Sequence, residues 1–169
     1  MNIILRKATL SDYDDSWSAI AYGKKTMFDN GRHQWTDDYP SPALIHRDIE
    51  VGQGYVLTVD GKVAAYGVIV LNGEPEYKNL KDGEWLTNED YYVVHRMAVA
   101  ASFRGKGMGK AFFLSLAEHC KVTNIHSIKV DTNHDNVEML HLLPSIGFKR
   151  CGIIDYADHG TRIAFELVV

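Results

Sequence analysis

The spacing of apolar residues along the chain predicts strands and helices in alternation. Apolar residues at every second position indicate half-buried strands, and apolar residues at every third and fourth position indicate amphipathic helices. The expected strands are residues 2–9, 55–59, 62–71, 91–99, 125–131, 148–155 and 161–168. The expected helices are residues 11–28, 42–51, 107–122 and 135–146.

Capping and turn residues support several of these boundaries. Ser11 is a suitable N-cap for the first helix, and Ser41 followed by Pro42 is typical of the start of the second. Asp60 and Gly61 tolerate the positive φ of a tight turn, so the two strands that flank them are expected to form a hairpin.

Together these elements predict an α/β (α+β) fold with a mixed, mainly antiparallel sheet of about seven strands and helices on both faces. A chain of 169 residues, 46% of them hydrophobic, suits one packed core, so we expect residues 1–169 to form a single domain. An acidic insertion, residues 72–90, precedes the fourth strand. A loop of this length is usually functional or disordered, and its acidity also fits a solvated surface.

Charge and composition argue against several classes of function. A net charge of −4 argues against nucleic-acid binding, because phosphate backbones require a basic face. No apolar run approaches the roughly 18 residues that cross a bilayer, so we expect no membrane association and a cytoplasmic location. Cys120 and Cys151 lack Cys-x-x-Cys spacing and are expected to be reduced thiols of the core. The histidines show no metal-binding spacing, so no metal site is expected.

The most informative stretch is residues 102–110, a glycine-rich turn between a strand and a helix. The first N–H groups of a helix lack intrahelical partners, and glycines allow an anion to approach the backbone closely. Arg104 and Lys110 add positive charge to this turn. A Walker loop is excluded, because Arg104 and Ala111 stand where it requires glycine and Ser or Thr.

The spacing of Arg104, Gly107 and Gly109 resembles Arg-x-x-Gly-x-Gly, the acyl-CoA pyrophosphate loop of the GCN5-related N-acetyltransferase (GNAT) superfamily. Asn136 and then Gly147-Phe148 follow in the order and at the spacing of that superfamily. The resemblance covers nearly the whole chain and implies a GNAT-like sheet that splays between its fourth and fifth strands.

The resemblance implies acetyl-CoA as co-substrate and acetyl transfer to a primary amine, here expected to be that of a small molecule, by direct transfer in a ternary complex. A homodimer is one assembly open to the family. The residues expected to bind acetyl-CoA are Met97, Ala98, Val99, Arg104, Gly105, Lys106, Gly107, Met108, Gly109, Lys110, Asn136 and Met139.

The catalytic groups are less clearly implied. Leu143 stands where the family often has a tyrosine that protonates the leaving thiolate, so no residue is assigned as the general acid. Val93 stands at a common position of a catalytic carboxylate, and His95 shares its strand face. An unperturbed His95, with a pKa near ~6.5, would accept an ammonium proton at neutral pH; an ordered water or a purely structural His95 are the alternatives. Arg96 points oppositely and is expected to pair with a carboxylate on an adjoining strand.

The acceptor side is expected to include Trp35, Tyr39 and Trp85, whose rings lie among acidic residues and suit a cation. The tryptophans also fit the edge of the core. Two other functions stay open: a non-catalytic acyl-CoA-binding or sensor domain, favoured by Leu143, and a protein or peptide N-terminal acetyltransferase, which would need an open acceptor groove.

Overall fold

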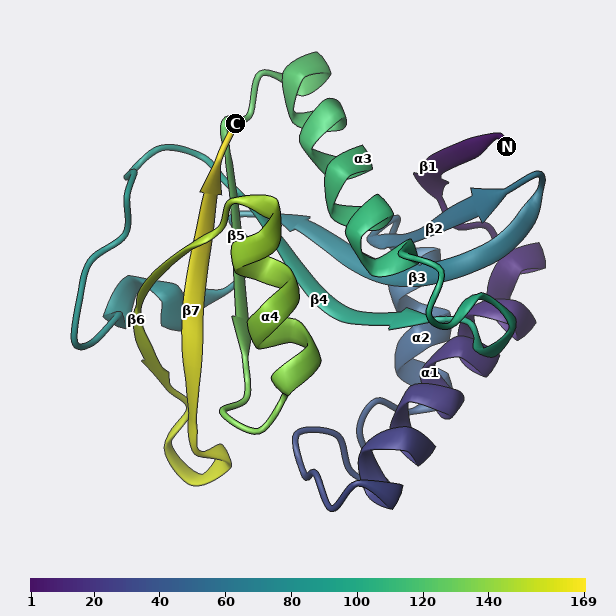
Figure 1. The fold of residues 1–169 in the computed structure, drawn as a ribbon, viewed down its shortest axis with the longest axis horizontal. Coiled ribbons are helices and arrows are strands. Elements are labelled where there is room, and N and C mark those ends of the chain that lie inside the picture. The colour runs from purple at the N-terminus through teal and green to yellow at the C-terminus, as the bar shows by residue number, and fades with distance from the viewer. The chain divides into compact units, whose positions relative to one another are not determined.

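The computed structural model describes residues 1–169. The strands are β1 (Ile3–Lys7), β2 (Gly54–Val59), β3 (Lys62–Leu71), β4 (Tyr92–Val99), β5 (Ser127–Thr132), β6 (Lys149–Asp155) and β7 (Thr161–Val168). The α-helices are α1 (Tyr13–Asp29), α2 (Pro42–Glu50), α3 (Met108–Thr123) and α4 (Val137–Ile146), and Figure 1 labels all of these elements. Short 3₁₀ helices occupy Leu10–Asp12, Pro75–Asn79, Ala101–Phe103 and Ala157–His159.

The expected mixed sheet is confirmed. Its seven strands follow the order β1-β2-β3-β4-β5-β7-β6. The pairs β1–β2, β2–β3, β5–β7 and β6–β7 are antiparallel. The β4–β5 pair is parallel and joins only Tyr92 to Ile128 and Val93 to Lys129, although both strands continue beyond these residues. Such brief pairing fits the splay expected between the fourth and fifth strands.

The chain forms two compact units. The first contains residues 1–69 and 95–116, and the second contains residues 70–94 and 117–169. The expectation of a single domain therefore stays a prediction, and each unit is described by itself.

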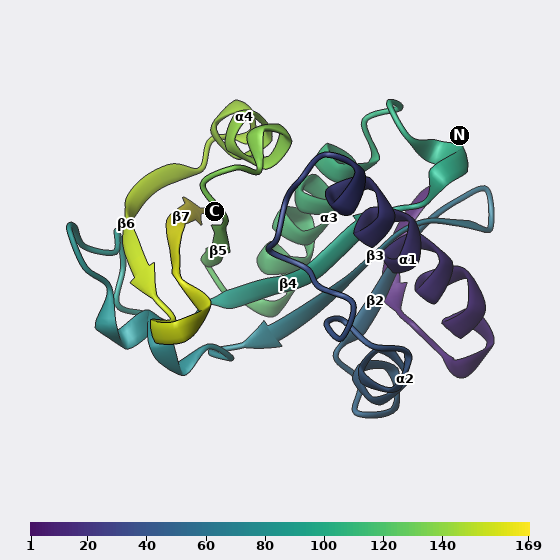
Figure 2. The same cartoon turned by 90° about the horizontal axis from the view of Figure 1, so that it is seen from below.

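Helices cover both faces of the sheet in the first unit. The Tyr66 hydroxyl donates a hydrogen bond to Asp48 of α2, and a Cβ at Gly67 would lie 2.6 Å from the Phe112 ring of α3. Neighbouring strand residues point to opposite faces, so α2 and the first half of α3 pack on opposite sides of β3, as Figures 1 and 2 show.

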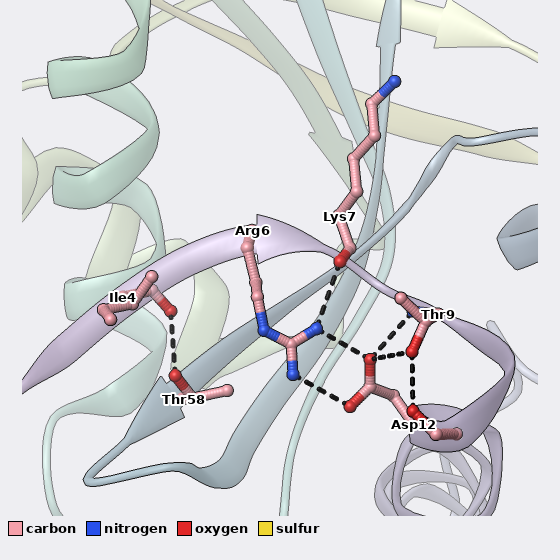
Figure 3. Close-up of polar contacts among 7 residues, drawn as sticks. Ile4, Arg6, Lys7, Thr9, Asp12 and Thr58 are labelled. Atoms are coloured by element: carbon pink, nitrogen blue, oxygen red, sulfur yellow. Dashed lines mark hydrogen bonds and ion pairs between the residues drawn. The ribbon is translucent and has the colours of Figure 1, made fainter.

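The start of α1 differs from the expected Ser11 cap. A 3₁₀ turn comes first, and the Asp12 carboxylate accepts hydrogen bonds from the Thr9 backbone N–H at 2.8 Å and from both terminal nitrogens of Arg6 at 2.7 and 3.0 Å (Figure 3). Ser11 instead shares a hydrogen bond with the Thr9 hydroxyl. An ionised acceptor forms the stronger bond, so Asp12 fixes this corner, and Arg6 holds the pKa of that carboxyl below its usual value.

The caps and turns expected elsewhere are confirmed. Ser41 Oγ accepts from the Leu44 N–H at 3.1 Å, with Pro42 at the first position of α2. Asp60 and Gly61 both have positive φ, 50° and 83°, in the β2–β3 hairpin.

In the second unit, α4 covers one face of the β5–β7–β6 strands and the insertion covers the other (Figure 2). The insertion is ordered and firmly attached. Lys81 pairs with Ile153 of β6 through two backbone hydrogen bonds of 2.8 Å. The fully buried Glu166 of β7 accepts from the Leu86 N–H and from the Thr87 and Ser127 hydroxyls at 2.6–2.7 Å.

Both cysteines are free and buried. None of the helices combines the length and the apolar character needed to cross a membrane.

Candidate active site

The glycine-rich turn leads directly into α3. Gly105 and Gly107 have φ of +74° and +77°, in the left-handed region that favours glycine. The first hydrogen bond of the helix runs from the Ala111 N–H to the Gly107 carbonyl at 3.0 Å. The N–H groups of Met108, Gly109 and Lys110 come before that bond and have no intrahelical acceptor.

The surroundings of this turn are open and positively charged. A Cβ at Gly105 or Gly107 would meet no heavy atom within 4 Å. Arg104, Lys106 and Lys110 are exposed, and the Arg104 guanidinium lies 5.6 Å from the centre of the Tyr22 ring. Free backbone donors, positive charge and open space fit an anion such as a pyrophosphate.

The strand β4 carries an irregularity just before the residues expected to bind pantetheine. Arg96 has a φ of +47°, and its guanidinium binds both oxygens of Asp48 at 2.8 and 3.0 Å. The partner is a carboxylate, as expected, but it belongs to α2 and not to an adjoining strand. Arg96 also donates to the Tyr39 hydroxyl at 3.1 Å, so it ties β4 to α2 and to the loop before α2.

His95 is partly buried in β4. Burial, reinforced by the charge of Arg96, lowers the pKa of His95 to about 4. The premise of an unperturbed imidazole therefore does not hold, and His95 is neutral at pH 7. Its catalytic role stays a prediction.

The residues expected on the acceptor side occupy three different settings. Trp35 packs on α1, where a Cβ at Gly23 would lie 3.0 Å from its ring. Tyr39 is exposed and receives the hydrogen bond of Arg96. Trp85 lies in the second unit, partly buried, 5.1 Å from the Tyr77 ring and donating to the Tyr77 carbonyl. Trp35 and Tyr39 thus belong to one unit and Trp85 to the other.

Three further polar residues come together in the second unit. The hydroxyls of Tyr77 and Tyr156 both donate to Asp131 Oδ2, at 2.8 and 2.6 Å. Neither Asp131 nor Tyr156 was among the residues expected at the site from the sequence. A usable signal exists in the alternation of β5, where Ser127, Lys129 and Asp131 put polar groups on one face between apolar neighbours.

Comparisons with known proteins identify the family. A family model described as "Acetyltransferase (GNAT) family" matches residues 11–148. The chain belongs to the GNAT family. A GNAT-family acetyltransferase of Streptococcus agalactiae is 29% identical, covers 99% of this chain and 95% of its own, and superposes with a TM-score of 0.90.

Two further known proteins are similar to this chain. A GNAT-family acetyltransferase of Listeria monocytogenes, 19% identical over 99% of this chain and 95% of its own, shares the fold with a TM-score of 0.74. N-acetylaspartate synthetase of Xenopus tropicalis is 26% identical over 102 residues, which are 60% of this chain. The match spans about a third, 32%, of that relative's length.

Membership of the GNAT family makes the chain an acetyltransferase and implies acetyl-CoA as its acetyl donor. The turn before α3 has free N–H groups and positive charge, which are features that suit the pyrophosphate of that donor. No group of three or more His, Cys, Asp or Glu side chains is placed to hold a metal ion.

Two GNAT positions on α4 have clear structural roles. Asn136 Oδ1 accepts from the Met139 N–H at 3.3 Å and so caps the helix, which leaves its amide nitrogen available. Leu143, at the position of the usual tyrosine, is fully buried. A buried leucine has no proton to donate, so this helix contributes no general acid at residue 143.

Proposed function

We propose that this GNAT enzyme transfers acetyl from acetyl-CoA to the primary amine of a small molecule, by direct attack in a ternary complex within a single domain. The observation that carries the proposal is the turn of residues 104–110, with its two left-handed glycines and its unpaired N–H groups at the start of α3. Its two buried free thiols suit the reducing cytoplasm, where we place the reaction.

Two observations favour a small acceptor over a protein terminus. The Xenopus relative is named for a product that is an N-acetylated amino acid. The insertion of residues 72–90 is fixed to β6 and β7, whereas a protein substrate would need an open groove there.

The residues of the turn bind the donor in this proposal. The N–H groups of Met108, Gly109 and Lys110, with Gly105 and Gly107 allowing close approach, hold the pyrophosphate, and Arg104 and Lys106 add charge. Met97, Ala98 and Val99 present backbone groups to the pantetheine arm, and a backbone N–H of this strand polarises the thioester carbonyl. The Asn136 amide and Met139 contact the same arm.

When bound, acetyl-CoA supplies an activated acyl group and a thiolate leaving group. The amine nitrogen forms a bond to the acetyl carbon as the carbon–sulfur bond breaks, and the protein mainly supplies orientation. His95, neutral at physiological pH, or a water takes the proton that the ammonium must lose. Trp35, Tyr39 and Trp85 contribute to acceptor binding.

The test combines two measurements. Calorimetry measures the binding of acetyl-CoA, and a thiol assay measures the release of CoA in the presence of amino acids, polyamines or short peptides. Binding together with release by a free amino acid or polyamine supports the proposal. Release only with peptides would favour an N-terminal acetyltransferase. Failure to bind acetyl-CoA would overturn the proposal.

A further inference from the structure

One face of β5 carries three polar side chains beneath the insertion: Ser127, Lys129 and Asp131. Ser127 and Lys129 both have partners within the chain. Ser127 donates to the buried Glu166 at 2.7 Å. The Lys129 ammonium lies 4.4 and 4.0 Å from the centres of the Trp85 and Tyr91 rings.

Asp131 differs from its two neighbours because half of its carboxylate is unused. Both tyrosine hydroxyls, from Tyr77 and Tyr156, donate to Oδ2. Oδ1 accepts no hydrogen bond from the chain. Oδ1 is not among the buried polar atoms that lack a partner, so it keeps contact with solvent and can accept a hydrogen bond from outside the chain.

The surroundings of Asp131 hold this oxygen in place. Tyr77 is 2% exposed and packs against Trp85 at 5.1 Å and Tyr91 at 6.4 Å between ring centres. Tyr156 belongs to a separate segment, directly after β6. The carboxylate is therefore fixed by two hydroxyls on separate segments, while Asp131 itself stays partly exposed.

The charges around Asp131 favour a cation. Glu74 lies close enough for the Asp131 charge to raise its pKa, after burial, which is the larger cause. Two cations are also near. Lys129 lies over the Trp85 and Tyr91 rings. Arg162 is close enough to lower the pKa of Asp131, and its guanidinium donates to the carbonyls of His159 and Thr161. Two partly buried carboxylates among aromatic rings attract an organic ammonium ion.

Asp131 also lies at an informative place in the sheet. Parallel pairing of β4 with β5 ends at Val93 and Lys129, and Asp131 is the next residue on the same face of β5. Asp131 therefore lies on β5 just beyond the residues that pair with β4.

We propose that Asp131 Oδ1, positioned by Tyr77 and Tyr156, binds the cationic amino group of the acceptor. This inference rests on the proposed function and adds to it the residue that recognises the acceptor as its ammonium ion. Glu74 adds negative charge to the same site, and the aromatic rings exclude water from one side of it. Tyr77 and Tyr156 are positioning residues that act through Asp131.

The proposal predicts a characteristic pH dependence. Burial raises the pKa of Asp131, the two tyrosine hydroxyls oppose the rise, and Arg162 opposes it further. Amine binding needs the ionised carboxylate, so the KM for the amine rises as pH falls through this elevated pKa. Removing one hydroxyl with Tyr156→Phe raises the pKa again and moves the acidic limb to higher pH.

The first test compares Asp131→Asn with Glu89→Gln, which removes the same charge from an exposed position of the insertion. Loss of a charge-assisted hydrogen bond predicts a KM for the amine about 10- to 100-fold higher in Asp131→Asn. The Kd for acetyl-CoA stays unchanged in both variants, and Glu89→Gln behaves as the wild type. An unchanged KM in a folded Asp131→Asn would overturn the inference while the proposed function stands.

The second test separates recognition from folding. The probe is the amine of the panel that gives the fastest CoA release. Its Kd for the CoA-loaded protein is compared with the Kd of the analogue in which a hydroxyl replaces the amino group. The wild type prefers the amine, Asp131→Asn loses that preference, and Tyr156→Phe keeps it with a shifted pH profile. A purely structural cluster would weaken both ligands equally, and that result contradicts the proposal.

Discussion

At the scale of single residues, burial decides the chemistry of His95. An exposed imidazole titrates near neutrality, but burial and the neighbouring Arg96 lower the pKa of this one to about 4. The folded protein therefore binds fewer protons than the unfolded chain between about pH 4 and 6.5. In that window the free energy of unfolding falls as pH falls, and above it the contribution of His95 is fully present.

This reasoning predicts the stability of a His95→Gln variant. From pH 7 to pH 4 the wild type should lose up to roughly 3 kcal/mol more stability than the variant. Urea unfolding at both pH values measures the difference, and His33→Gln, at an exposed site, is the control. Equal losses in wild type and His95→Gln would show that the imidazole titrates normally.

A second residue-scale prediction concerns Gly107. Gly107→Glu places a carboxylate in the anion-binding turn and should abolish measurable acetyl-CoA binding by calorimetry. Gly31→Glu is a matched control, because Gly31 also has a positive φ, +68°, and no heavy atom within 4 Å of a Cβ. Both variants should lose about 1 kcal/mol through backbone strain.

Only Gly107→Glu should lose the donor, because only that position faces the proposed pyrophosphate. Retained affinity in Gly107→Glu would refute the assignment of the turn. A loss in both variants would point to strain or charge in general.

At the scale of elements, the insertion shows how a long loop becomes a fixed wall. Two carboxylates attach it to the sheet in different ways. Glu166 is buried and accepts three hydrogen bonds, whereas Asp155 forms an exposed ion pair with Lys81. Buried polar groups are costly to leave unpaired, while exposed ion pairs contribute little.

Glu166 and Asp155 are expected to differ strongly in how much they contribute to stability. Glu166→Gln replaces one acceptor oxygen with an NH₂ group that faces hydroxyl or N–H donors, and should cost about 2–3 kcal/mol. Hydrogen exchange should quicken at the backbone amide of Leu86. Asp155→Asn should change neither quantity appreciably, so similar effects in both variants would disprove this account.

At the scale of the whole molecule, the chain crosses between the two compact units inside regular elements. β3 passes from the first unit to the second after Ile69, β4 returns after Val94, and α3 crosses after Leu116. A strand or helix that unfolds in one unit loses hydrogen bonds that continue into the other. We therefore expect cooperative unfolding, as in a single domain.

Tryptophan fluorescence tests that expectation. Trp17 and Trp35 belong to the first unit and Trp85 to the second. Urea transitions of Trp85→Phe, followed by the remaining fluorescence, should coincide with its far-UV circular dichroism. Acetyl-CoA at 100 times its Kd should stabilise the whole protein by about 2.7 kcal/mol. Separate transitions for fluorescence and dichroism would instead mean that the units unfold independently.

Local patterns in the sequence were enough to predict the helices, the strands and the glycine-rich turn. Helix caps, a hairpin turn and apolar periodicity act over a few residues, so the Ser41 cap and the Asp60-Gly61 turn could be read directly. The prediction that Ser11 caps the first helix was wrong, because Asp12 pairs with Arg6 on the preceding strand. Local spacing does not reveal that pairing.

Contacts between groups that are distant in sequence appear only in the folded chain. Tyr77 and Asp131 are 54 residues apart, and Thr87 and Glu166 are 79 apart. The carboxylate partner of Arg96 likewise proved to be on a helix and not on a strand. Such contacts, and the lowered pKa of His95, depend on how elements pack and exclude water, and packing is set by the whole chain at once.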